Sequence, residues 1–175
     1  MVYIYKASIP GSKTFMREYE VKANMDLFSF NSFITNDLGF SPGQMVLFVG
    51  YNGKGDKGGR YGMFDLGDGS MDKVTFEALV RKGEVSLRYC YDLRSDSAIV
   101  LNFEGEAEDS PRRSYPRVTG SKGQNPDQFG GVYEDIETYD PTKDPDPEQE
   151  ETEDEAPDMF DEDFSEIYGS ETDEA

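Results

Sequence analysis

The stretch Val85-Ser-Leu-Arg-Tyr-Cys-Tyr-Asp-Leu93 alternates apolar or aromatic residues with small or polar ones along its whole length. This pattern is typical of a strand covered on one face, with Val85, Leu87, Tyr89, Tyr91 and Leu93 inward. After the polar residues 94–97, residues 98–103 alternate again, and Ile99, Leu101 and Phe103 share one face. Four polar residues are a usual length for a hairpin loop. We therefore expect a long antiparallel hairpin at the centre of a sheet.

The segments outside this hairpin predict further strands and two helices. A helix over residues 27–38 follows the possible caps Asn24 and Asp26 and ends at Gly39, and a shorter helix runs from the cap Thr75 to Gly83. Residues 50–62 and 111–133, rich in Gly or Pro, read as loops. The expected fold is α+β: one mainly antiparallel sheet with one main and one short helix, β-grasp-like. Its remaining strands begin at residue 2 and span residues 15–21 and 45–49.

Charge divides the chain into a domain and a tail. Residues 141–175 hold 16 acidic residues and one lysine, Lys143, whereas residues 1–140 carry a net charge of −5. From about Ile136 the chain is rich in proline and acid, a composition that buries too little apolar surface to fold alone. We expect an α+β domain over residues 1–135 and a disordered acidic tail over residues 136–175.

Composition also restricts the chemistry. The chain has no histidine and one cysteine, which excludes Ser–His and Cys–His catalysis, histidine-ligated metals and an internal disulfide. Given these missing side chains, we expect that the protein is not an enzyme and holds no cofactor. No signal segment or long apolar run is present, so we also expect a cytoplasmic protein that does not bind membranes. The acidic surface should repel nucleic acid and attract a basic protein surface, such as that of a DNA-binding protein.

Four short motifs have ordinary structural explanations. The glycines of residues 53–58 match a dinucleotide pattern, but no helix is expected after them, so a flexible inter-strand loop is favoured. The aspartates of residues 65–72 have the wrong spacing for calcium and indicate a solvated turn. Cys90 reads as a half-buried small residue, although Arg88 could lower the pKa of its thiol. The basic cluster Arg112, Arg113 and Arg117 is expected to pair within the molecule rather than with phosphate.

The tail contains one amphipathic pattern. Its large apolar residues recur at helical spacing among acids, as in acidic segments that fold as a helix in a partner's groove. The alternative is a solubilising tail whose apolar residues are incidental. The residues predicted to bind a partner are Met159, Phe160, Phe164, Ile167 and Tyr168.

Two short motifs resemble those of a known family. They are Tyr91-Asp92-Leu93 and Tyr115-Pro116-Arg117, the latter followed by Pro126 and by Gly-Gly-Val-Tyr at residues 130–133. Together with residues 26–45, they make residues 1–135 similar to the Ri-plasmid ORF-three-like family, also labelled insertion-element passenger proteins of the TnpR type. The chain resembles an acidic-tailed branch of that family, without the cysteines that many members carry after Tyr-Pro-Arg. The resemblance implies an α+β fold and a plasmid or mobile-element setting, and it supplies no activity.

Three functions are therefore open. The first is a non-enzymatic protein-interaction module that presents its acidic tail to a partner. The second is an acidic mimic of nucleic acid that inhibits or chaperones a basic DNA-binding protein. The third is a weak nucleic-acid or nucleotide binder that uses the basic and glycine-rich loops of the body.

Overall fold

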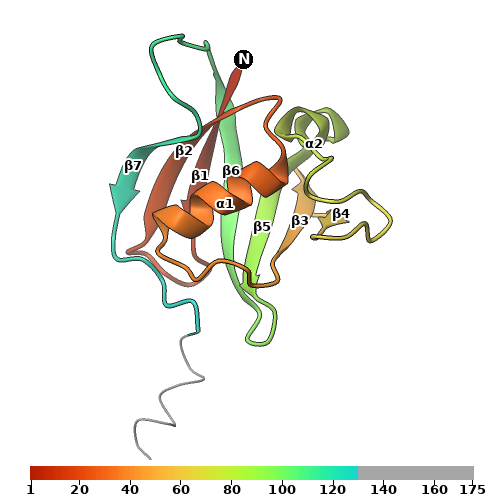
Figure 1. Ribbon diagram of the computed structural model, residues 1–175, viewed down its shortest axis with the longest axis vertical. Helices are drawn as coiled ribbons and strands as arrows, with labels where there is room; N and C mark the ends of the chain where they lie inside the picture. The colour runs from red at the N-terminus through yellow and green to blue at the C-terminus, as the bar shows by residue number, and fades with distance from the viewer. Residues whose placement is uncertain (130–175) are drawn as a thin grey trace, which may run out of the picture. The chain divides into compact units, whose positions relative to one another are not determined.

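A computed structural model describes residues 1–129, all of which belong to one compact unit. Seven strands form one antiparallel sheet in the order β4-β3-β5-β6-β1-β2-β7 (Figure 1). Hairpin β5–β6 lies at the middle of this order, and β1 pairs with β6 on one side and with β2 on the other. The strands are β1 Val2–Ser8, β2 Met16–Lys22, β3 Leu47–Asn52, β4 Lys57–Tyr61, β5 Glu84–Asp92, β6 Ser97–Ala107 and β7 Arg117–Lys122.

The central hairpin confirms the predicted alternation over most of its length. Leu87, Tyr89 and Tyr91 belong to the hydrophobic core, as do Ile99 and Leu101 of β6. Two residues depart from the prediction. Val85 is half-buried and outside the core, whereas its neighbour Glu84 is buried, and Leu93 lies in the turn and is 50% exposed. The strand ends at Asp92, whose side chain caps the turn, so the inward alternation stops one residue before Leu93.

Both helices pack on the same face of the sheet. Helix α1, Leu27–Asp37, crosses this face (Figure 1) and begins at the cap Asp26, whose side chain accepts a hydrogen bond from the Ser29 N–H. Helix α2, Phe76–Lys82, is capped by Thr75 and ends at Gly83, which has the left-handed φ of 83° that glycine adopts without strain. The Phe76 ring lies 5.1 Å from the rings of Tyr5 and Phe30, so α2, β1 and α1 share one core.

Two segments predicted as loops are strands at the sheet edges. β4 lies within the glycine-rich residues 50–62 and pairs with β3, and β7 lies within residues 111–133 and pairs with β2. The prediction of a flexible inter-strand loop is therefore wrong for residues 57–61. Asn52 closes the β3–β4 turn by accepting hydrogen bonds at 2.9 Å from the N–H groups of Lys54 and Asp56.

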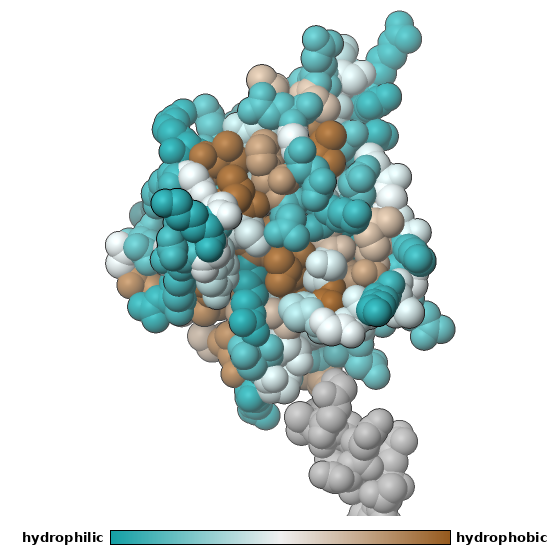
Figure 2. Space-filling view, turned by 180° about the vertical axis from the view of Figure 1, so that it is seen from behind, coloured by the Kyte–Doolittle hydropathy of each residue, from teal (hydrophilic) through white to brown (hydrophobic). Residues whose placement is uncertain are grey.

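The other face of the sheet has no helix against it in the part of the chain that the structure describes. From this side, hydrophobic residues lie between hydrophilic ones across the middle of the face (Figure 2). Val49, Cys90 and Ala98 are buried there, separate from the main core cluster. The domain is thus a two-layer α+β structure over its described residues.

The β-grasp-like arrangement stays a prediction. No helix of this region is long and apolar enough to cross a membrane.

Candidate functional site

Two hollows adjoin each other where the β5–β6 turn meets the segment between α1 and β3. The larger has a volume of about 550 Å³ and is lined by residues 43–45, residues 91–94 and Phe129. The smaller has a volume of about 240 Å³ and lies between α1 and the following segment. Gly43 and Gln44 line both hollows. We call the pair the 43–44 groove.

Exposed apolar side chains gather along this groove. Seven large apolar residues of the described chain are exposed, and four of them line it. Met45 and Leu93, 65% and 50% exposed, line the larger hollow, while Phe28 and Met63, each 42% exposed, line the smaller. Contiguous apolar side chains at the surface of a soluble domain mark interaction sites more often than isolated ones do.

The β5–β6 end of the groove is held by Asp92. Its carboxylate accepts a hydrogen bond from the Ser95 hydroxyl at 2.6 Å and another from the Arg94 N–H at 2.9 Å. These donors hold the pKa of Asp92 below its usual range, because they stabilise the charged form. The capped turn thereby fixes Leu93 and Arg94 at the rim.

Aromatic packing forms the inner wall of the groove. The Tyr91 ring lies 4.7 Å from the Phe40 ring, and burial raises the pKa of the Tyr91 hydroxyl. In the smaller hollow the Tyr89 hydroxyl donates to Asn31 Oδ1 at 2.9 Å. Burial raises the pKa of Tyr89 to about 12. Both phenols stay protonated at neutral pH and can offer hydrogen bonds rather than charge.

The third wall comes from the segment after β7. The Ser41 N–H donates to Gln128 Oε1 at 2.7 Å, and Gln128 Nε2 donates to the Ser41 carbonyl at 3.4 Å. These paired bonds attach residue 128, which lines the smaller hollow, to the α1–β3 segment. The groove therefore combines parts of the chain more than 80 residues apart in sequence.

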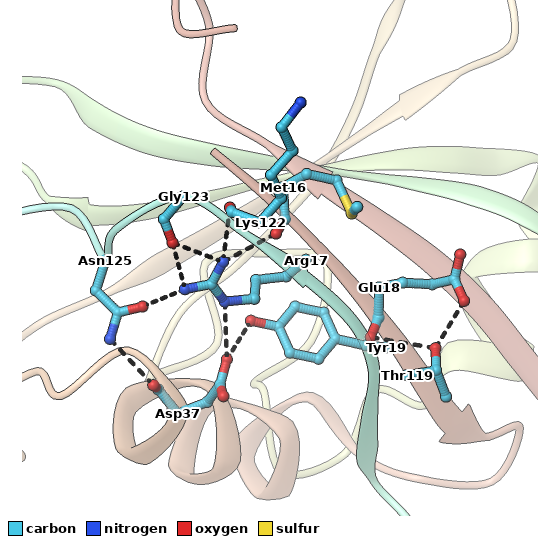
Figure 3. A network of polar contacts seen from close by, with 9 residues as sticks. All are labelled: Met16, Arg17, Glu18, Tyr19, Asp37, Thr119, Lys122, Gly123 and Asn125. Atoms are coloured by element: carbon cyan, nitrogen blue, oxygen red, sulfur yellow. Dashed lines mark hydrogen bonds and ion pairs between the residues drawn. The ribbon is translucent and has the colours of Figure 1, made fainter. Parts of the chain in front are cut away.

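A buried arginine holds the same segment in place (Figure 3). Arg17 is 5% exposed, and its guanidinium donates to the carbonyls of Lys122 at 2.9 Å and Gly123 at 3.3 Å, and to Asn125 Oδ1. It also lies 3.9 Å from the Asp37 carboxylate at the end of α1. The Tyr19 hydroxyl donates to that carboxylate at 2.8 Å. Arg17 thus joins β2, α1 and the segment that leads to the groove.

A buried carboxylate explains the glycines of β3 and β4. Glu84 is 7% exposed, and it accepts hydrogen bonds from the Gly59 N–H at 2.8 Å and from the Tyr61 hydroxyl at 2.7 Å. A Cβ on Gly50 or Gly58 would come within 2.2 or 2.4 Å of the Glu84 carboxylate oxygens. Glycines here make room for a structural acid, and the strand β4, not the helix of a dinucleotide site, follows the glycine-rich turn.

Comparison with known proteins places the chain in a family. The sequence profile of the plasmid pRiA4b ORF-3-like proteins matches residues 6–168. The chain belongs to the plasmid pRiA4b ORF-3-like protein family. Among solved structures, a protein of unknown function from Methanosarcina mazei Go1, MM3350, is similar with a TM-score of 0.63 and 22% identity, over 78% of each chain. That likeness shows the fold alone. A search of the curated proteins found no match.

The two motifs that resemble the ORF-3-like family lie in different places. Tyr91 and Asp92 line the larger hollow of the groove. Tyr115, Pro116 and Arg117 lead into β7, and β7 begins at the opposite end of the sheet from the β5–β6 turn (Figure 1). Arg117 Nε donates to Glu20 at 2.6 Å, and Lys22 lies over the Tyr115 ring at 5.9 Å. The structure thus does not bring the two motifs into one site. The TnpR label and the acidic-tailed branch stay expectations.

The remaining predicted sites have structural explanations or lie outside the described chain. Asp65 accepts hydrogen bonds from the N–H groups of Gly67 and Gly69, and it closes a turn. Burial raises the pKa of the Cys90 thiol although Arg88 acts to lower it, which agrees with the favoured interpretation of Cys90 as a small packing residue; it is buried rather than half-buried. Within residues 1–129 no three acidic or cysteine side chains gather as metal ligands would. The predicted partner-binding residues of the tail, from Met159 to Tyr168, lie outside the described residues.

Sequence reasoning missed the groove and the buried charges of Arg17 and Glu84. Arg17 could have been found, because it alternates with Phe15, Tyr19 and Val21 on the inward face of a predicted strand. Glu84 had a weaker signal. It is an acid at the first position of a strand, and the preceding segment of residues 50–62 is rich in glycine. The groove had no local signal, since its walls come together only in the folded chain.

Proposed function

We propose that this chain is a non-enzymatic protein-interaction module. Its 43–44 groove binds an apolar side chain of a partner protein, and its acidic C-terminal residues attract a basic surface on the same partner. The single observation that carries this proposal is the placement of four exposed apolar side chains along two adjoining hollows.

Charge supports a basic partner. Residues 1–129 contain 16 basic and 17 acidic residues, whereas residues 130–175 contain one basic and 20 acidic residues. Nearly all of the net charge of −20 thus lies in the last quarter of the chain. Such a charge density speeds encounter with a cationic surface and depends strongly on salt. Apolar contact in the groove would supply the part of the affinity that salt does not remove.

The groove is tested by matched substitutions in the full-length chain. Met45→Ser with Leu93→Ser removes two apolar groove residues without changing charge, and both are exposed enough to leave the fold intact. Phe64→Ser with Leu66→Ser removes two exposed apolar residues that do not line the hollows. Proteins retained from native cells by each variant are compared by quantitative mass spectrometry. We expect the groove pair to lose partners that the control pair keeps. Identical profiles for all variants would refute the role of the groove.

The acidic segment is tested separately. Phe160→Ala with Phe164→Ala removes apolar residues, while Asp161→Asn with Asp163→Asn removes two charges nearby. If the segment binds as an amphipathic helix, the first pair weakens capture of the partner much more than the second. Equal losses would refute binding of the segment as a helix in a groove.

A second candidate function, mimicry of nucleic acid, is favoured by the 20 acidic residues of residues 130–175. Under this alternative the partner is a basic DNA-binding protein, and DNA displaces it from the chain. Capture should then fall steeply as salt rises. Capture that is insensitive to both DNA and moderate salt would exclude mimicry.

A further inference from the structure

The uncovered face of the sheet carries an organised set of cations. Arg60 of β4 and Arg88 of β5 both pair with Val49 of β3, one on each side, and Arg88 pairs in turn with Val100 of β6. Because these residues are directly opposite one another in the register, their side chains leave the sheet on the same face. The resulting row reads cation, valine, cation, valine across four adjacent strands.

A second row runs beside the first. Lys57 pairs with Tyr51, which pairs with Ser86, and Asn102 connects Ser86 to Lys6 of β1. The Ser86 hydroxyl donates to Asn102 Oδ1 at 2.8 Å, which confirms that these side chains share the face. Lys57, Arg60 and Lys6 are exposed. Together the two rows place four cations around Val49 and Val100, and we call this surface the basic face.

Few acids neutralise the basic face. Arg88 Nη2 lies 3.0 Å from the Asp96 carboxylate, but Asp96 is in the turn and its side chain is 81% exposed. An exposed pair of this kind is weak and exchanges readily. The buried Nε of Arg88 has no hydrogen-bond partner, so its guanidinium is incompletely paired. Glu18 lies opposite Lys6 and accepts a hydrogen bond from the Thr119 hydroxyl at 2.7 Å, so it offsets the charge of Lys6. Within residues 1–129 no ion pair joins Lys57 or Arg60 to an acid.

We propose that the basic face binds an acidic amphipathic helix of a partner protein. Neighbouring strands are about 4.8 Å apart, so the cations of the first row are about 10 Å apart with a valine between them. A helix rises about 10.5 Å over seven residues, so acids at i and i+7 match the cations. Apolar residues at i+3 and i+4 then lie above Val49, which is 5% exposed, and contact the aliphatic parts of the Arg60 and Arg88 side chains beside it. The helix would cover this face as α1 covers the other, and a helix on a bare sheet face is a usual way to complete a layer.

The composition of the face favours a peptide over nucleic acid. Single-stranded nucleic acid is held by several aromatic platforms that stack on bases, and the two rows contain one aromatic residue, Tyr51. The half-buried Val100, beside the buried Val49, Cys90 and Ala98, instead suits apolar side chains. The high negative charge of the whole chain does not prevent binding, because charges further apart than about 8 Å are screened at physiological salt. This site lies on the opposite face of the sheet from α1 and is independent of the 43–44 groove.

The experiment titrates ¹⁵N-labelled full-length protein with a synthetic helical peptide that has Glu at i and i+7 and Leu at i+3 and i+4. Its controls are a scrambled peptide of the same composition and oligothymidylate. Lys57→Ser with Arg60→Ser removes two cations of the basic face, and Arg112→Ser with Arg113→Ser removes the same charge from exposed arginines elsewhere. Val100→Thr tests the apolar contact with almost no change in shape.

We expect the peptide to shift amide signals of β3, β5 and β6, and the scrambled peptide to bind more weakly. The Lys57/Arg60 variant should bind about five- to tenfold more weakly, while the Arg112/Arg113 variant should bind like the natural protein. Equal weakening by both charge variants would reduce the effect to net charge and overturn the proposal. Shifts produced by oligothymidylate and not by the peptide would replace it with nucleic-acid binding. Absence of shifts with every probe would refute it.

Discussion

Gly58→Ala tests whether the glycines of β4 exist to accommodate the buried carboxylate of Glu84. The added methyl group would lie 2.4 Å from Glu84 Oε1, the oxygen that accepts the Gly59 N–H. Either the carboxylate moves and its hydrogen bonds weaken, or the two strands separate. Overpacking of this kind costs about 1–3 kcal/mol, and weakening a hydrogen bond to a charged group costs about 1.5–3 kcal/mol. We expect a loss of roughly 2–4 kcal/mol in the free energy of unfolding.

A double-mutant cycle separates this explanation from a general intolerance of β4 to side chains. Glu84→Ala alone leaves the Gly59 N–H and the Tyr61 hydroxyl without their acceptor and should cost about 2–5 kcal/mol. In that background, however, Gly58→Ala has space, and its added cost should fall below about 1 kcal/mol. Urea unfolding followed by far-UV circular dichroism measures all four proteins.

Gly53→Ala is the matched control in the same hairpin. Its Cβ would meet one neighbour, a methyl of Val85, at an ordinary 3.9 Å. We expect a change within about 0.5 kcal/mol. The reasoning is refuted if Gly58→Ala costs as much with Glu84→Ala as without it, or if Gly53→Ala is equally destabilising.

Three further predictions concern other buried or capped groups. Arg17→Met should lower the free energy of unfolding by about 3 kcal/mol, because several carbonyl acceptors lose their donor. Amide hydrogen exchange should then rise first in β7, and a uniform rise would contradict the role of Arg17 as an anchor. The depressed pKa of Asp92 contributes stability that is present above the unfolded pKa of about 3.9 and is lost as pH falls through the folded pKa. Ser95→Ala should therefore reduce the loss of stability between neutral and acidic pH, and an unchanged pH profile would contradict this. Tyr89 of the native protein, with a pKa of about 12, should ionise at higher pH than the tyrosines of the urea-unfolded chain. Ultraviolet absorbance measures both titrations, and coincident curves would show that the Tyr89 hydroxyl is accessible.

The parts of the fold that sequence predicted are those with a strong local pattern. The alternation within the central hairpin, the apolar stripe of α1 and the caps Asp26 and Thr75 each depend on neighbours a few residues apart. The caps and the stripe are present, and the alternation holds from Leu87 to Tyr91 and from Ile99 to Leu101. β4 was missed because Lys57-Gly-Gly-Arg-Tyr61 contains residues that strands usually avoid. Its glycines make sense only when Glu84, more than 20 residues later, lies above them.

The candidate sites were harder for a related physical reason. β7 has a single large apolar residue, Val118, since an edge strand covers little of the core. The 43–44 groove depends on distant segments that the fold brings together, and the basic face depends on register between strands. No short window of sequence contains either. Lys57, Arg60 and Arg88 read separately as solvated charges, and the alignment of Val49 between two of them is a property of the sheet.

The position of β1 has a consequence for how the protein is made. β1 lies inside the sheet, and its partner β6 begins almost 90 residues after β1 ends. During synthesis the hairpin β1–β2 emerges early with both outer hydrogen-bonding edges unsatisfied, and the edge of β1 must wait until residue 107 has left the ribosome. Such long-range pairing slows folding, commonly to milliseconds or seconds, and leaves an edge open to wrong partners. We expect nascent chains that stop before β6 to depend on chaperones, and chains extended beyond it to fold without them.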